Sequence, residues 1–117
     1  MSTPAFDYAA YRAAFEAKDV PSWLAFYADD AEWLEYRHGD PPHSPNVMRG
    51  RGEIGAFLER VAQMPIGLTL DREVLGDGRI AFEVTCDMGG AGKILENVIC
   101  DVRDGQIVRQ VDVEAWD

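Results

Sequence analysis

The chain has 117 residues, 47% hydrophobic and 27% charged, which is the composition of one ordinary globular domain. Its 21 acidic and 11 basic side chains give a net charge of −10, which repels phosphate backbones and anionic lipids and argues against binding to nucleic acid or membranes. Because there is neither an apolar run of the roughly 18 residues that span a bilayer nor a secretion signal in the N-terminal residues, we expect a single cytoplasmic domain over residues 1–117.

The N-terminal residues predict an amphipathic helix. Tyr8, Tyr11 and Phe15 recur at helical spacing with alanines between them. Pro4 lies near the expected start and Asp7 in the first turn, positions that both residue types favour.

A second, shorter helix is expected at about 22–27, followed by an aromatic-rich strand at about 31–37. The residues Ala28-Asp29-Asp30 are interpreted as the polar break between them. Three prolines in residues 38–49 predict a long irregular loop, and loops of this length are often functional. The third helix should run over about 52–63.

Four strand-like segments complete the chain, at about 68–75, 79–88, 94–103 and 106–116. Asp-Gly stands in two of the turns between them, which is a strong hairpin signal. Helices followed by a meander of long strands predict an α+β fold with the helices on one face of a curved sheet.

The two cysteines are expected to remain free. If residues 79–88 and 94–103 pair as a hairpin, Cys86 lies opposite about Leu95 and Cys100 opposite about Ala81. The two thiols are then several residues out of register, too far apart for a disulfide, and we expect both to be buried.

This order of elements resembles the nuclear transport factor 2-like superfamily, and within it the SnoaL-like domains, over nearly the whole chain. The segments that carry the resemblance are YRAAFEAKD (Tyr11–Asp19), FYADDAEW (Phe26–Trp33), MRGRGEI with AFL (Met48–Leu58) and DVRDGQIVRQVDVEAW (Asp101–Trp116). The resemblance implies a cone: a strongly curved, mostly antiparallel sheet whose three N-terminal helices close a central pocket. Many members dimerise through the open face of the sheet, which implies a homodimer.

Similarity to ketosteroid isomerases implies roles for individual residues. Tyr11 falls where that family has the tyrosine that donates to the oxyanion, and Glu35 falls where it has the aspartate base. The second oxyanion donor, a protonated carboxylic acid, would fall near Ile99, whose side chain has no donor.

Two other branches of the superfamily point to aspartates. Asp87 and Asp112 fall where limonene epoxide hydrolases have two aspartates on neighbouring strands, although the arginine between them is Thr85 here. In SnoaL-like cyclases one aspartate on the final strands does acid–base work, and Asp112, or less closely Asp87, matches it.

The residues themselves leave alternatives open. Asp112 shares a strand face with Gln110, Glu114 and Trp116 by the period of two. If this face lines the pocket, desolvation raises the pKa of Asp112 toward neutrality, as a general acid or base requires; otherwise Asp112 belongs to a surface ladder. Glu35 could be a solvated glutamate at a strand end.

Further ligand contacts are assigned to aromatic and rim residues: Trp33, Trp116, Phe57 and His38. Trp33 and Trp116 could equally be packing residues, and Tyr11 a core tyrosine. No metal is expected, because the spacing of His38 and His43 with the nearby carboxylates fits no helix or ribbon metal site. No cofactor is expected either.

We therefore expect a protein that binds a small hydrophobic organic molecule. The first hypothesis is a cofactor-free isomerase, cyclase or hydrolase in which Glu35 and Asp112 act as acid and base and Tyr11 polarises an oxygen. The second is a non-catalytic ligand-binding or accessory protein. One cavity should be lined by Tyr11, Trp33, Glu35, Asp87 and Asp112.

The sheet is expected to leave an apolar face without a cover, since three helices cannot cover both faces of long strands. The residues assigned to that face are Ile80, Phe82, Val84, Val98 and Val111. A homodimer through the sheet would cover it.

Overall fold

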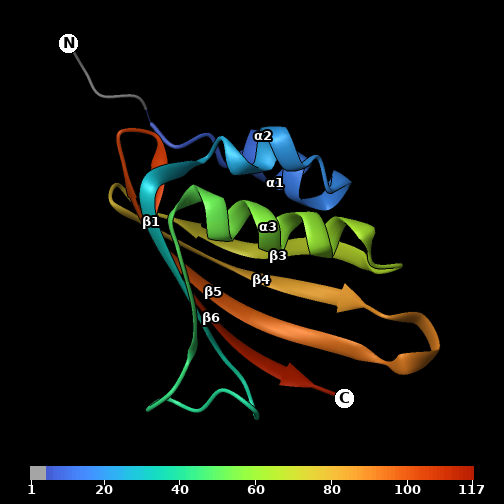
Figure 1. The fold of residues 1–117 in the computed structure, drawn as a ribbon. Coiled ribbons are helices and arrows are strands. Elements are labelled where there is room, and N and C mark those ends of the chain that lie inside the picture. Colours follow the sequence, from blue (N-terminus) through green and yellow to red (C-terminus); the bar gives the residue numbers. More distant parts are fainter. Residues whose placement is uncertain (1–4) are drawn as a thin grey trace.

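A computed structural model describes residues 5–117, so Pro4, expected near the start of the first helix, lies outside the described residues. The elements are α1 (Tyr8–Ala17), α2 (Val20–Leu24), β1 (Tyr27–Tyr36), β2 (Asn46–Arg49), α3 (Gly50–Gln63), β3 (Gly67–Leu75), β4 (Arg79–Asp87), the 3-10 turn η1 (Gly89–Ala91), β5 (Lys93–Arg103) and β6 (Gln106–Trp116). All three α-helices lie on one face of a single sheet (Figure 1). Across residues 5–117, no helix is both long enough and apolar enough to cross a membrane.

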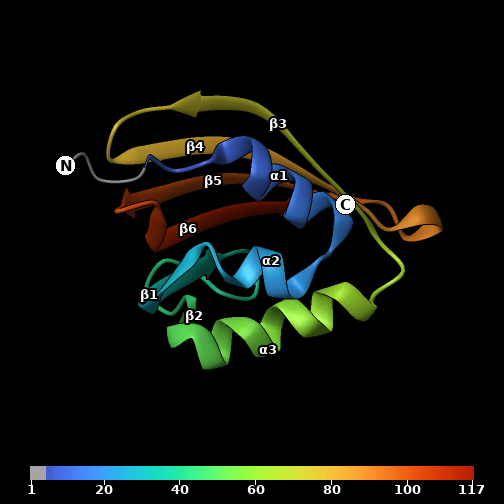
Figure 2. The ribbon, with the colours of Figure 1, turned by 90° about the horizontal axis from the view of Figure 1, so that it is seen from above.

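The sheet has six strands in the order β2-β1-β6-β5-β4-β3 and is not closed. Every neighbouring pair is antiparallel except β1 and β6, which are parallel. Helix α1 packs toward β3, and α3 lies along the β1–β2 side (Figure 2). The predicted α+β fold, with a mostly antiparallel sheet and helices segregated to one face, is confirmed.

Short polar side chains fix where the first two helices begin. The Asp7 carboxylate accepts a hydrogen bond of 3.0 Å from the backbone N–H of Ala10, which caps α1. Asp19 caps α2 in the same way, and Pro21 occupies its first turn. Helix α2 therefore spans 20–24 instead of the expected 22–27.

The first strand is longer than predicted. Ala28-Asp29-Asp30 is not a break but part of β1, and the register of β1 on β6 shifts between Tyr27 and Glu32. These polar residues lie in the irregular stretch between the paired positions Tyr27 and Glu32, so pairing on either side outweighs their low strand propensity.

The expected 38–49 loop ends in a strand. Residues 46–49 form β2, which pairs antiparallel with the end of β1. Gly50 follows at once with a φ of 79°, a conformation that favours glycine, and lets the chain turn directly into α3. The helix thus begins two residues before the predicted start.

The β4–β5 hairpin is shifted by one residue from the expected register. Cys86 lies opposite Ile94, and Cys100 lies opposite Ile80. The shift arises in the turn, where η1 is closed by a hydrogen bond of 2.9 Å from the Met88 N–H to the Gly92 carbonyl. Both thiols are free and buried, as predicted.

The main core lies between the helices and the concave face of the sheet, and it contains most of the residues expected on an uncovered face. These are Ile80, Phe82, Val84 and Val98, all 3% exposed or less. The assignment of these residues to an uncovered face was wrong, because alternation groups residues by face without saying which face is inside. The opposite face instead exposes the intervening Leu95, Ile99 and Val113.

Candidate functional site

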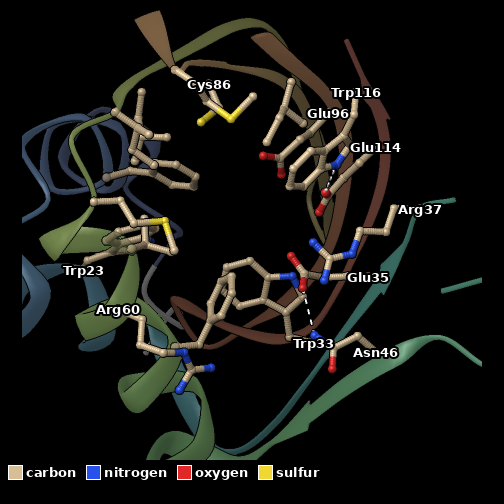
Figure 3. Close-up of a pocket in the computed structure, with 18 residues that line it drawn as sticks. Trp23, Trp33, Glu35, Arg37, Asn46, Arg60, Cys86, Glu96, Glu114 and Trp116 are labelled. Carbon is tan, nitrogen blue, oxygen red and sulfur yellow. Dashed lines mark hydrogen bonds between the residues drawn. The ribbon is translucent and has the colours of Figure 1, made fainter. Parts of the chain in front are cut away.

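A cavity of about 320 Å3 opens between α3, the first two helices and the concave face of the sheet. Its lining is mostly apolar and includes aromatic rings and sulfur-containing side chains. Those that bear most on ligand binding are Trp23, Trp33, Phe57, Met64, Cys86 and Trp116. Figure 3 shows the lining side chains around an open centre, with Trp23, Trp33, Cys86 and Trp116 labelled among them.

Three carboxyl groups stand on one wall of this cavity. Glu35 comes from β1, Glu96 from β5 and Glu114 from β6, and their side chains point inward from the strand side (Figure 3). Strand pairing brings them together, since Glu96 lies opposite Glu114 in the β5–β6 ladder. An apolar cavity therefore has one strongly acidic wall.

A fourth carboxyl group, that of Asp112, belongs to the same cluster but does not line the cavity. Asp112 lies beside Glu35 in the parallel β1–β6 ladder and is fully buried. Single oxygens of Glu35, Asp112 and Glu114 lie within 4.8 Å of one another, a spacing at which carboxylates can hold a cation.

Two neutral donors hold the Asp112 carboxylate. The indole Nε1 of Trp33 donates to Oδ2 at 2.9 Å, and the amide Nε2 of Gln110 donates to Oδ1 at 3.1 Å. Both bonds favour the ionised form of the carboxyl group. Asp112 is thus held in place by the wall residue Trp33 and does not itself face a ligand.

A hydrogen-bonded chain connects Asp112 to the first helix. The Tyr27 hydroxyl donates to Gln110 Oε1 at 2.6 Å, and the Tyr11 hydroxyl lies 3.1 Å from the Tyr27 hydroxyl. Both tyrosines are completely buried, and burial raises the pKa of each. Tyr11 therefore acts at the far end of a buried polar network, away from the cavity.

The carboxyl groups differ in how strongly they hold a proton. Burial, followed by repulsion from Asp112, raises the pKa of Glu35 to about 8. Burial and repulsion from the other three carboxylates raise the pKa of Glu96 to about 10. Burial also raises the pKa of Asp112, but the bonds from Gln110 and Trp33 lower it, and the result is about 7. The cluster therefore retains protons at neutral pH, most firmly on Glu96.

Polar groups at the rim complete the site. Asn46 on β2 donates a hydrogen bond of 2.9 Å to Glu35 Oε1. The Arg37 guanidinium pairs with Asp40 at 2.6 Å and lies 5.4 Å from the centre of the Trp116 ring. The Arg60 guanidinium lies 5.7 Å from the centre of the Phe57 ring.

The structure divides the residues predicted from sequence into three groups. Trp33, Glu35, Phe57 and Trp116 line the cavity. Tyr11 and Asp112 are buried beside it, within the polar network. Asp87 and His38 are exposed and line no part of it.

The prediction that Tyr11, Asp87 and Asp112 line one cavity with Trp33 and Glu35 was therefore wrong for those three. Asp87 follows Cys86, which faces the cavity, so alternation turns Asp87 to the opposite side. Its Oδ1 accepts a hydrogen bond of 2.9 Å from the Gly89 N–H and shapes the β4–β5 turn instead.

Sequence reasoning missed Glu96, which has the most strongly raised pKa of the cluster. A signal was available, because Glu96 alternates with Ile94 and Val98, two residues that are buried. An acidic residue in the apolar phase of a strand indicates a carboxyl group turned toward the core. Asn46 was missed because the 38–49 segment was expected to be irregular.

Comparisons with known proteins agree with this architecture. A proposed ketosteroid isomerase from Kribbella flavida DSM 17836 has a similar structure, with a TM-score of 0.75 and 19% identity, over 94% of this chain and 76% of that chain. An NTF-2 like protein of unknown function from Burkholderia xenovorans LB400 gives a TM-score of 0.77 and 19% identity, over 94% of this chain and 80% of that one. At such identities the likeness shows the fold alone.

In sequence, the chain is 38% identical over 72 residues to the sucrose transport protein SUT3 of Oryza sativa. The match covers 60% of this chain, and the chain spans only 13% of the length of that curated relative. The family model of the SnoaL-like domain matches residues 8–110. Because this match spans most of the chain, the protein belongs to the SnoaL-like family and has the nuclear transport factor 2-like fold.

Proposed function

We propose that the cavity binds a small, largely apolar organic molecule and that its carboxyl groups move protons to and from that molecule. The observation that carries this proposal is the pair Glu35 and Glu96, which face the same apolar cavity with pKa values of about 8 and about 10. Carboxyl groups whose environments separate their pKa values are the usual basis for assigning acid and base roles.

In this proposal Glu35 is the group that changes its protonation state. A pKa near the working pH lets a carboxyl group both accept and return a proton. Asn46 orients it through the bond to Oε1, while burial raises its pKa and repulsion from the neighbouring Asp112 raises it further. Asp112 is then a positioning residue, since it has no surface in the cavity.

Glu96 is proposed as the donor that stabilises negative charge on the ligand. It keeps its proton at neutral pH and can donate a hydrogen bond to an oxyanion. Glu96 would thus take the role of the second oxyanion donor, the protonated carboxylic acid that ketosteroid isomerases have at the position near Ile99.

These roles suit isomerisation or cyclisation of a carbonyl compound. The Glu35 carboxylate would take a proton from the carbon next to the carbonyl group, and the electrons of that C–H bond would move onto the carbonyl oxygen. Glu96 would stabilise the resulting enolate. Glu35 would then return the proton to another carbon, so that atoms and charge balance. A hydrolase would in addition have to hold a water molecule in line for attack.

Binding without turnover is the second candidate, and the position of Tyr11 favours it. The hydroxyl expected to polarise a ligand oxygen is engaged with Tyr27 in the core. Glu35, Asp112 and Tyr11 therefore do not all meet in the cavity, and the carboxyl groups would then only orient a ligand.

Deuterium exchange separates the two functions whatever the product of the reaction is. Cyclic enones and aromatic ketones that raise the melting temperature would be incubated in D2O and followed by NMR at the carbon next to the carbonyl group. We expect exchange with the parent protein and at least a hundredfold slower exchange with Glu35→Gln, while binding persists. Glu59→Gln, an exposed residue outside the cavity, is the control. Ligands that bind without exchange would favour the binding protein.

We also propose a homodimer through the face of the sheet opposite the helices. Register places Ile99 beside Val111, Val111 beside Leu34 and Leu34 beside Val47, which forms an aliphatic row across four strands. Ile99 is 51% exposed and Val113 on the neighbouring row is 57% exposed. A second copy of the chain would bury this row.

A further inference from the structure

We infer that the ligand of this cavity is an organic cation, an aromatic or alicyclic body that carries a protonated amine or a quaternary ammonium group. The inference rests on the proposed function in that it assigns a substrate class to the same cavity. It comes from three properties of the lining: an excess of carboxyl groups over basic groups, ring faces next to those carboxyl groups, and limited volume.

Carboxyl groups outnumber basic groups in the cavity. Glu35, Glu96 and Glu114 line it, and Asp112 lies directly beside Glu35. Among the described residues that line the cavity, the basic ones are Arg37 and Arg60, both of which lie on ring faces, and Arg37 also pairs with Asp40. A cation on the ligand would supply the countercharge that these carboxyl groups need in order to ionise, whereas an anionic ligand would oppose their ionisation.

The rings are placed to receive the same cation. Trp33, Phe57 and Trp116 line the cavity together with the carboxyl groups. Two of these rings already have guanidinium groups within 5.7 Å of their centres, so cations contact rings at this cavity within the chain itself. Aromatic faces beside carboxylates are the usual surroundings of bound ammonium groups.

The volume limits the size of the ligand. About 320 Å3 lies at the small end of ligand cavities, which range over roughly 300–1,000 Å3. One ring system with a short ammonium-bearing chain fits this limit better than a four-ring body does.

A positive charge on the ligand would also change the protonation of the carboxyl groups in the site. An ammonium group near Glu35 favours the ionised form of that carboxyl group, so binding should release a proton from the cluster. The other titratable or charged groups that face this cluster are Asp112 on β6, Arg37 directly after β1, Cys86 on β4 and Arg60 on α3. Release of the proton from Glu35 would raise the fraction of Glu35 that is present as the base when the ligand is bound.

The test compares two probes that differ in charge but hardly in shape. These are 2-phenoxyethyl-trimethylammonium and its neutral isostere 3,3-dimethylbutyl phenyl ether, in which carbon replaces the charged nitrogen. Binding would be followed at pH 8 by tryptophan fluorescence, since Trp33 and Trp116 line the cavity. Calorimetry of the ammonium probe in two buffers of different ionisation enthalpy would count released protons.

We expect the ammonium probe to bind at least tenfold more tightly than the ether and to release protons. Glu114→Gln should weaken the ammonium probe at least fivefold and leave the ether unchanged, whereas Glu59→Gln should change neither. Equal or tighter binding of the ether, or no binding of the ammonium probe at 1 mM, would overturn the inference. Mn2+ that binds more tightly than the ammonium probe and depends on Glu114 would also overturn it, because the carboxylates would then serve a metal ion.

These outcomes are distinct from failure of the proposed function. If neutral ketones bind and exchange deuterium while the ammonium probe does not bind, the proposed proton transfer is supported and the cationic ligand class is rejected. If the ammonium probe binds as expected and no bound ligand exchanges deuterium, the cationic ligand class is supported and the proposed catalysis is rejected.

Discussion

Glu35 lies directly beside Asp112 in the parallel β1–β6 ladder, so that two carboxyl groups far apart in sequence share one buried site. Each raises the cost of ionising the other, in addition to the cost of leaving water. Glu96 and Glu114 stand on the same wall of the cavity, and their carboxyl groups raise the cost of ionisation further. The protonation of this cluster is the property through which stability and function are most readily tested.

Stability should fall as pH rises above about 5. The pKa values of Glu35 and Glu96 are raised in the folded state to about 8 and about 10 from an ordinary value of 4.5, so the native state binds more protons than the unfolded state across that interval. Each group then lowers the free energy of unfolding by up to about 1.4 kcal/mol per pH unit until pH passes its folded pKa. Melting curves between pH 5 and pH 9.5 measure this. A melting temperature that is constant or rises over the range would contradict it.

Glu35→Gln should stabilise the protein at pH 8. The amide oxygen can accept the bond from Asn46 Nδ2, and the amide nitrogen can donate toward Glu114, while the buried charge disappears. We expect a melting temperature several degrees higher than that of the parent, with a smaller gain at pH 5, where Glu35 already holds its proton. Glu59→Gln is the matched control on an exposed site. A lower melting temperature at both pH values would show that Glu35 is not strained.

Asp112→Asn should give a lower melting temperature than Glu35→Gln at the same pH. Both oxygens of Asp112 accept hydrogen bonds, from Trp33 Nε1 and Gln110 Nε2, so an amide nitrogen would meet a donor at one of the two positions. Such a mismatch costs about 1–3 kcal/mol in a buried site and offsets the gain from removing charge. Differential scanning calorimetry of the two variants tests the order, and the reverse order would contradict the assigned network.

Tyr27→Phe should destabilise the protein more than Tyr11→Phe. Loss of the Tyr27 hydroxyl leaves the buried Gln110 oxygen without its donor at 2.6 Å and also removes the partner of Tyr11. Loss of the Tyr11 hydroxyl removes only the outer bond of the chain. We expect about 1–3 kcal/mol for Tyr27→Phe and less for Tyr11→Phe in urea denaturation. Equal effects would mean that the two hydroxyl groups are not connected in series.

Ile99→Lys should convert the proposed dimer into a monomer. A lysine in the middle of the aliphatic row would place a charge in the interface, and Ile99 is half exposed in the single chain, so folding should be unaffected. Light scattering on a sizing column at micromolar concentration measures the mass, with Ala56→Lys on the exposed part of α3 as the control. A parent protein that is already monomeric would remove the proposal.

Local patterns in the sequence predicted the three α-helices and every strand except β2, in the right order. The spacing of Tyr8, Tyr11 and Phe15 predicted α1, and the Asp-Gly turns predicted the strand meander, because helix periodicity and turn chemistry act over a few residues. The same alternation correctly grouped Gln110, Asp112 and Glu114 on one face of β6, since that period is a property of any strand.

Tertiary structure decided which groups meet. The parallel pairing of β1 with β6 set Glu35 beside Asp112, and the β5–β6 register added Glu96 opposite Glu114. Pairing between distant strands also placed β2, turned Asp87 away from the cavity and held Tyr11 in the core. Such contacts depend on which face of the sheet the helices cover. The alternation of side chains along one strand is the same whichever face is covered, so it does not predict these contacts.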